Sequence, residues 1–290
     1  MKVNKKTTFL IVVIVTAAAI LFSQSSMLIA AADKSKLKDI LNLDPNAPQA
    51  IAEAQTDFSN SKKIDKKQAD QNANVITKAK KLISKAEKEY LAEGWFHMSS
   101  SIEVFSTAQQ TFPDGSPIPT KWTNESWILL DKDGDAIKAV SIQDTGDPKL
   151  LQISVYENGA WTNISLGMTG EPEKYHPTLS GGILDSASTY KDIVKLSSET
   201  SVVNGQNMFV FTSEENLNTP VSEGDNKQKD QQIYGNVVKY YFAESSGLPV
   251  QIENYNINST GALEISQRIL MNVTEKVTEP PADILAYFIK

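Results

Sequence analysis

The chain has 290 residues, two histidines, no cysteine and a formal net charge of -7. The lack of cysteine excludes disulfides, thiolate metal sites, cysteine catalysis and a lipid-modified cysteine. Residues 1–94 carry 15 basic and 10 acidic side chains, whereas the remainder carries 13 basic and 25 acidic ones. Nucleic-acid binding needs Lys and Arg clustered against phosphates, so we expect no nucleic-acid partner for this acidic main domain.

The N-terminus has the pattern of an export signal. Basic residues come first, an apolar run fills positions 9–22, and small residues follow up to Ala32. This order predicts a secretory signal peptide over residues 1–32, with a mature start at Asp33. The alternative is an uncleaved anchor, because the run approaches the ~20 residues of a membrane span, and the protein would then associate with a membrane through residues 9–22. Polar residues 23–26 favour the signal peptide. Both interpretations predict an extracytoplasmic domain in the periplasm, the cell envelope or the medium.

Two segments lead into the main domain. Residues 33–71 are polar and rich in lysine and alanine, so we interpret them as a tether or arm with little to bury. From Asn72 to Glu93 apolar residues recur at three- and four-residue steps, opposite a lysine-rich side. This spacing predicts an amphipathic helix that needs a surface to lie on, with Gly94 as its stop. The main domain is expected over residues 72–290.

After Gly94 the apolar period becomes two, which predicts strands. The expected strands are 95–106, 121–130, 136–143, 150–156, 160–166, 193–203, 208–212, 237–243, 248–257 and 262–273. Residues 170–182, rich in proline and glycine, and a short helix from Ile183 to Tyr190 are expected to cover the sheet. Residues 213–232 are expected to form a polar surface loop, and residues 283–290 a closing helical turn. The fold class is therefore α+β, with about ten antiparallel strands and one long preceding helix.

The order of elements resembles the LolA-like superfamily of lipoprotein carriers. The resemblance rests on the helix running into Gly94-Trp95, the turn ESSGLPVQIE at residues 244–253 and the tail EPPADILAYF at residues 279–288. It implies a curled sheet that forms an incomplete barrel, with helices on the concave side and an apolar hollow for acyl chains. The family's lid arginine and the lipid-anchored cysteine of its mycobacterial members have no counterpart here.

The resemblance implies a function and a set of site residues. We expect a non-enzymatic exported carrier or sensor that binds a lipid or an acylated lipoprotein. The alternative is an envelope protein-interaction module without a lipid ligand. The residues expected to line the hollow are Phe96, Met98, Trp122, Trp127, Ile183, Leu184, Tyr240 and Phe242. The competing interpretation for each of them is ordinary core between sheet and helix.

Other chemistry finds little support. Asp131, Asp133 and Asp135 start like a calcium loop, but Ala136 and Ile142 occupy the positions that need glycine and glutamate. These aspartates are better interpreted as turn residues. The two histidines are far apart in sequence, no Gly-x-Ser-x-Gly elbow is present, and no phosphate loop is found. We therefore expect no metal, no cofactor and no catalytic residues, and we expect His97 to face solvent or a strand neighbour.

Overall fold

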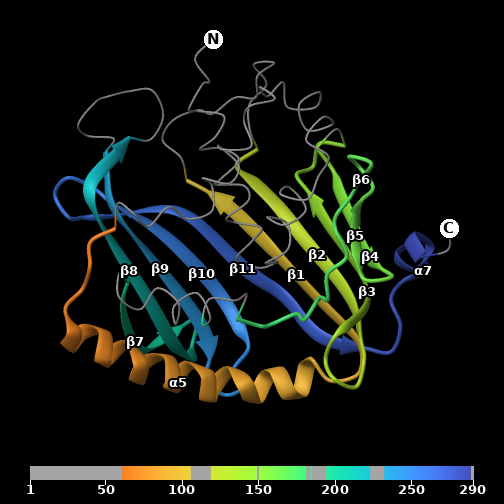
Figure 1. The fold of residues 1–290 in the computed structure, drawn as a ribbon, viewed down its shortest axis with the longest axis horizontal. Coiled ribbons are helices and arrows are strands. Elements are labelled where there is room, and N and C mark those ends of the chain that lie inside the picture. Colours follow the sequence, from red (N-terminus) through yellow and green to blue (C-terminus); the bar gives the residue numbers. More distant parts are fainter. Residues whose placement is uncertain are drawn as a thin grey trace, which may run out of the picture.

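The computed structural model describes residues 61–105, 119–148, 150–180, 184, 194–222 and 232–288. One long helix, α5 (Lys66–Tyr90), precedes an antiparallel sheet, and a short helix, α7 (Ala282–Leu285), with a 3₁₀ turn, Ala286–Phe288, closes the described part (Figure 1). The strands are β1 (Gly94–Val104), β2 (Lys121–Leu130), β3 (Ala136–Asp144), β4 (Gln152–Glu157), β5 (Ala160–Asn163), β6 (Met168–Thr169), β7 (Val194–Val203), β8 (Gln206–Ser222), β9 (Gln232–Ala243), β10 (Pro249–Ile257) and β11 (Leu263–Val277). Among the described helices, none is long and apolar enough to cross a membrane.

The eleven described strands form one sheet in the order β6-β5-β4-β3-β2-β1-β11-β10-β9-β8-β7. Strands adjacent in sequence pair with each other, except β6 and β7, and the first strand, β1, pairs with the last, β11. The sheet curls into an open half-barrel, since its edge strands β6 and β7 do not pair (Figure 1). The expected fold class is confirmed, with eleven strands where the sequence indicated about ten.

Helix α5 lies across one end of the curled sheet, which we call the helix end (Figure 1). It begins at Lys66 rather than at Asn72, because Asp65 caps it: the Asp65 carboxylate accepts a 2.8 Å hydrogen bond from the backbone N–H of Gln68. Its buried stripe includes Ile76, Ala79, Ile83 and Ala86, which join the side chains of one sheet face in a single cluster. We call this face the inner face and the opposite one the outer face.

The side chain of Asn72 holds the start of α5 against the edge strand β7. The amide of Asn72 is fully buried; it donates to the carbonyl of Val194 at 2.7 Å and accepts from the N–H of Leu196 at 2.8 Å. These are two of the backbone groups that an edge strand leaves without a strand partner. Asn72 therefore acts for these residues as a neighbouring strand would.

The middle of α5 rests on the turn between β9 and β10. Gly247 in that turn has φ +78°, and a Cβ placed on it would lie 2.4 Å from the carbonyl oxygen of Leu82. Only glycine permits both this backbone conformation and this approach. Beyond the helix, the Leu91 carbonyl lies against Gly134 in the turn between β2 and β3. The helix thus closes the end of the half-barrel where these turns meet.

One stretch predicted as loop is a strand in the structure. Residues 213–222, expected to be loop, continue β8 through Ser222, with a register irregularity after Asn216. Of the expected covering helix, Leu184 is helical and buried; Ile183 and residues 185–190 lie outside the described residues, as do the signal segment and most of the arm. The closing turn is present: Ile284 is buried on the outer face with Trp127, Val140 and Val155.

We predict that Gly247→Ala lowers the free energy of unfolding by more than about 2 kcal/mol, because left-handed strain adds to the clash with Leu82. Gly205→Ala is the control, since Gly205 has φ +79° but nothing within 4 Å of an added Cβ. It should cost only about 1 kcal/mol. Urea unfolding of both variants measures the difference; equal losses would contradict the contact with α5.

We predict that Asn72→Leu destabilises the fold by about 2–4 kcal/mol, because it leaves the carbonyl of Val194 and the N–H of Leu196 without partners. Asn74→Leu is the matched control on the exposed side of the same helix, where a change within about 0.5 kcal/mol is expected. Thermal and urea unfolding followed by circular dichroism check both. An unaffected Asn72→Leu protein would show that β7 does not need this bridge.

Candidate functional site

Six of the eight residues predicted to line a hollow lie in one buried cluster on the inner face. They are Phe96, Met98, Trp122, Leu184, Tyr240 and Phe242, joined there by Ile76, Ala79 and Ile83 of α5. The structure therefore brings them together, and it also packs them with the helix. Ile183 lies outside the described residues.

Trp127 does not belong with them. It lies on the outer face, in the separate cluster under Ile284, and its ring stacks on His97 at 3.7 Å between centroids. His97 is buried between two strand neighbours: one ring nitrogen lies 3.2 Å from the Glu125 carboxylate and the other 3.1 Å from that of Glu275. The expectation that Trp127 faces the hollow is wrong, because residues 127–130 of β2 are apolar on both faces. His97 faces strand neighbours and not solvent.

The inner face is layered from the helix end outward. Strand pairing aligns Phe96, Ile128, Ala139, Tyr156 and Trp161 in a first, apolar row. The next two rows on β1 to β5 hold Met98 and a group of small polar residues, which we call the polar belt. Further out comes an apolar row with Ile102, Trp122, Ile269 and Ile252. The polar belt consists of Ser100, Asn124, Ser126, Ser141, Gln143, Ser154 and Asn163.

Several inner-face polar atoms have no hydrogen-bond partner. Ser126 is 1% exposed, and its Oγ is unpartnered. The other unpartnered buried side-chain atoms among the described residues are Trp161 Nε1, Gln267 Nε2 and Thr274 Oγ1. Register places all four on the inner face: Thr274 pairs with Met98, Gln267 with Val104, and Trp161 with Tyr156. Natural cores satisfy nearly all buried polar groups, so this concentration sets the inner face apart.

The charged side chains of β1 to β4 all point the other way. Side chains alternate along a strand, and every charged residue of these four strands has the parity of the outer face. They are Glu103, Lys121, Glu125, Lys138, Asp144 and Glu157, with His97 beside them. The polar belt is therefore polar without being charged. The sequence prediction missed it, although its signal is visible as serine and asparagine on the parity of Phe96 and Ile128.

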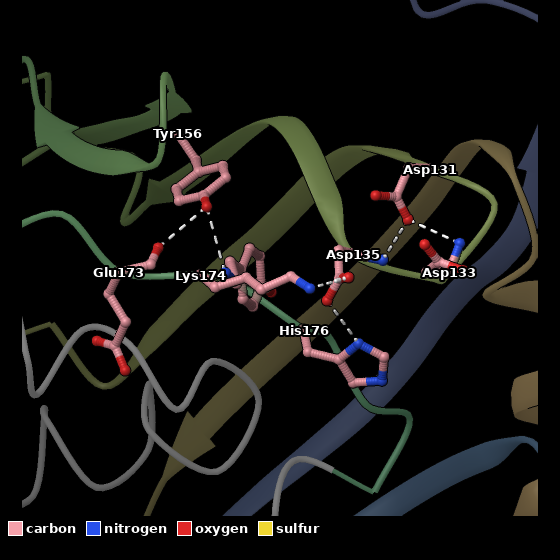
Figure 2. Close-up of polar contacts among 8 residues, drawn as sticks. Asp131, Asp133, Asp135, Tyr156, Glu173, Lys174 and His176 are labelled. Carbon is pink, nitrogen blue, oxygen red and sulfur yellow. Dashed lines mark hydrogen bonds and ion pairs between the residues drawn. The ribbon is translucent and has the colours of Figure 1, made fainter.

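Residues 170–180, which we call the strap, tie the helix end together. Their Tyr175 ring packs against Tyr156 and Trp161 at 5.7 and 5.3 Å between centroids. The Tyr156 hydroxyl donates to the Glu173 carbonyl at 3.0 Å and accepts from the Tyr175 N–H at 3.2 Å (Figure 2). The Leu179 N–H donates to the Glu87 carboxylate of α5. The expected cover is present here, at the helix end.

The aspartate turn anchors the strap. The Asp131 carboxylate accepts from the N–H groups of Asp133 and Asp135 at 2.8 and 3.0 Å, as a turn residue does (Figure 2). Asp135 pairs with Lys174 at 2.5 Å and with His176 at 3.1 Å. The hydrogen bond from Lys174 contributes most to holding the pKa of Asp135 below its usual value, against the smaller opposing effect of burial, and His176 adds to it. Asp135 thus holds the strap in place, and Asp131 shapes the turn that carries it.

The outer face has its own polar cluster, and there the groups are paired. Glu253 is 5% exposed and accepts from the hydroxyls of Tyr241 and Tyr255 at 2.8 and 2.6 Å and from Arg268 Nε at 3.1 Å. Burial alone raises the pKa of Glu253, but the bonds from Tyr255, Tyr241 and Arg268 outweigh it and hold the pKa below its usual value. Burial, followed by the bond to Glu253, raises the pKa of Tyr255 to about 12.

A cavity of about 470 Å³ opens where β1 ends and β2 begins. Most of its lining residues have outer-face parity, and they include the Lys121–Glu103 ion pair at 2.7 Å and Arg268. From the inner-face set only Ile102 and Trp122 contribute. This charged cavity is thus a different surface from the polar belt.

Comparison with known proteins assigns this chain to no family. No family model and no curated protein matches the sequence. LprF from Mycobacterium bovis aligns over 71% of this chain and 97% of its own at 10% identity and a TM-score of 0.33. The hypothetical protein CT021 from Chlamydia trachomatis aligns over 68% of this chain and 97% of its own at 10% identity and a TM-score of 0.18. Similarities this weak support no argument about function. The assignment to the class of α+β half-barrels rests on the strand order and on the helix across one end of the sheet (Figure 1).

We predict that stability falls as the pH drops below about 4.5, the ordinary value for Glu253. Because the folded pKa is lowered, the unfolded state binds a proton first, so the contribution of Glu253 is present above that pH and lost as the pH falls through the folded pKa. In Glu253→Gln the free energy of unfolding should fall less as the pH drops, and at pH 7 it should be lower by about 1–3 kcal/mol than in the wild type. Urea unfolding between pH 3 and 7 measures both, with Glu264→Gln as the exposed control. Identical acid slopes in both variants would contradict the role of Glu253.

Proposed function

We propose that this protein is an exported, non-enzymatic carrier or sensor that binds the acyl chains of a lipid or lipoprotein on the inner face of its half-barrel. The observation that carries the proposal is the group of four unpartnered buried polar atoms, all on one face. A sheet and helix packed into a solid core gain nothing from such atoms, which cost free energy when they have no partner. A bound molecule that reaches this face supplies partners for them.

The apolar rows supply the rest of the site. Ile102 and Trp122 lie beyond the polar belt, toward the end of the sheet that α5 does not close, and Met98 lies in the belt row nearer the helix end. Each methylene that such a surface removes from water contributes about 0.8 kcal/mol, so an acyl chain of ordinary length binds with several kcal/mol after its ordering cost. Export is supported by the sequence of residues 1–32.

The test is the lipid content of the full-length protein after export from a bacterial host. We expect extraction and mass spectrometry to find lipid in proportion to protein, and native mass spectrometry to find it bound. In Ser100→Leu the added side chain fills space that the ligand needs, so bound lipid should fall at least tenfold while the melting temperature is kept. Ser99→Leu is the matched control, since its side chain lies on the outer face.

Two results together would contradict the proposal. One is a wild-type protein that carries no lipid. The other is a strongly destabilised Ser100→Leu variant, because overpacking a solid core typically costs about 1–3 kcal/mol. They would favour the alternative of an envelope protein-interaction module, for which the charged cavity on the outer face is then the first surface to test.

A further inference from the structure

We infer that the ligand presents uncharged hydrogen-bond acceptors, the carbonyl oxygens of acyl esters, to the inner face, and that the polar belt selects against anionic lipids. This inference rests on the proposed function and names the chemical class of the ligand. It comes from the hydrogen-bonding capacity of the unpartnered atoms and from the absence of charge on the inner parity of β1 to β5.

The unpartnered atoms are all donors. Ser126 Oγ and Thr274 Oγ1 are hydroxyls, which donate one hydrogen each and also accept. Gln267 Nε2 and Trp161 Nε1 only donate. The remaining amide oxygen of Gln267 is already used, since it accepts from Asn254 Nδ2 at 2.7 Å. A molecule that satisfies these groups must therefore bring acceptors.

The acceptors must also be neutral. Carboxylate and phosphate groups accept strongly, but burying either one without a cation costs far more than burying a neutral carbonyl. No charged side chain has inner-face parity on β1 to β5, and all the charged residues of β1 to β4 lie on the outer face. Lys276, on β11 at the helix end, has its Nζ bound to the carbonyls of Ala92 and Glu93 at 3.1 and 2.8 Å. An acyl ester has the acceptors and lacks the charge.

The position of the belt fits such a molecule. Ser126 and Ser100 lie between the apolar first row and the apolar row with Ile102 and Trp122. Successive inner-face positions along a strand are about 6.6 Å apart. The distance from the donors of the belt to the neighbouring apolar row therefore matches the distance from an ester group to the first part of its hydrocarbon chain. The linkage would lie on Ser126, and the chains would extend along the apolar rows.

The experiment compares three ligands of equal chain type on the full-length, delipidated protein. Dioleoylglycerol, dioleoyl phosphatidylglycerol and oleic acid each displace the apolar fluorescent probe N-phenylnaphthylamine at pH 7.5. We expect dioleoylglycerol to bind at least tenfold more tightly than either anionic lipid. Anionic lipids that bind as tightly as dioleoylglycerol would overturn the inference while leaving the proposed function intact. A protein that binds neither the probe nor any lipid would overturn both.

Ser126→Ala tests the role of the belt directly. Its hydroxyl has no partner in the protein, so removing it should not lower the melting temperature. It should weaken dioleoylglycerol binding three- to tenfold and leave binding of the apolar probe unchanged. Ser99→Ala on the outer face is the control, with no effect expected on either ligand. Unchanged dioleoylglycerol affinity, or an equal loss for the probe and the lipid, would overturn the assignment of Ser126.

Discussion

The arrangement of this protein depends on how α5 is held against the sheet, and the first contact that holds it is made by the side chain of Asn72. An amide is the one neutral side-chain group that offers a donor and an acceptor in the same geometry as a peptide bond. Buried beside β7, it satisfies the carbonyl of Val194 and the N–H of Leu196 together. This fixes both the position and the rotation of the helix at its start. The glycine turn at Gly247 then fixes its distance from the sheet.

A helix held in this way closes one end of the half-barrel (Figure 1). The composition of the inner face follows the distance from the helix. The first row is aromatic and aliphatic, and the strap packs Tyr175 against it. Beyond it the polar belt begins. Further out the inner face is apolar and buried again at Ile102, Trp122 and Ile269, so the polar belt is a polar layer between two apolar ones.

The sequence predicted the parts of this fold that depend on local pattern. The periodicities of α5 and of most strands are local, and these elements were found, although the helix begins at Lys66 rather than at Asn72. The length of β8 was not, because Ser213 to Ser222 carries few apolar residues and is held by pairing to β9, a contact distant in sequence. Trp127 was assigned to the wrong face for a related reason, since an apolar run such as residues 127–130 gives no parity of its own.

The candidate site was predictable only in part. The aromatic residues were found because large apolar side chains are the usual signal of a hollow, and six of the eight share one cluster. The polar belt was missed because its members look like ordinary surface residues until strand register aligns Ser126 with Ser141 and Asn124 with Ser100. Register between strands is set by long-range pairing, which a single sequence does not reveal.

The two faces of the sheet treat their buried polar groups differently, and this difference is the strongest guide to function. On the outer face Glu253 has three hydrogen-bond donors, and both ring nitrogens of His97 contact carboxylates. Among the described residues, no buried side-chain polar atom of the outer face lacks a hydrogen-bond partner. On the inner face Ser126, Gln267, Thr274 and Trp161 each keep an atom without a partner. Leaving these inner donors unpaired costs stability, and the proposed ligand would offset that cost by accepting hydrogen bonds from them.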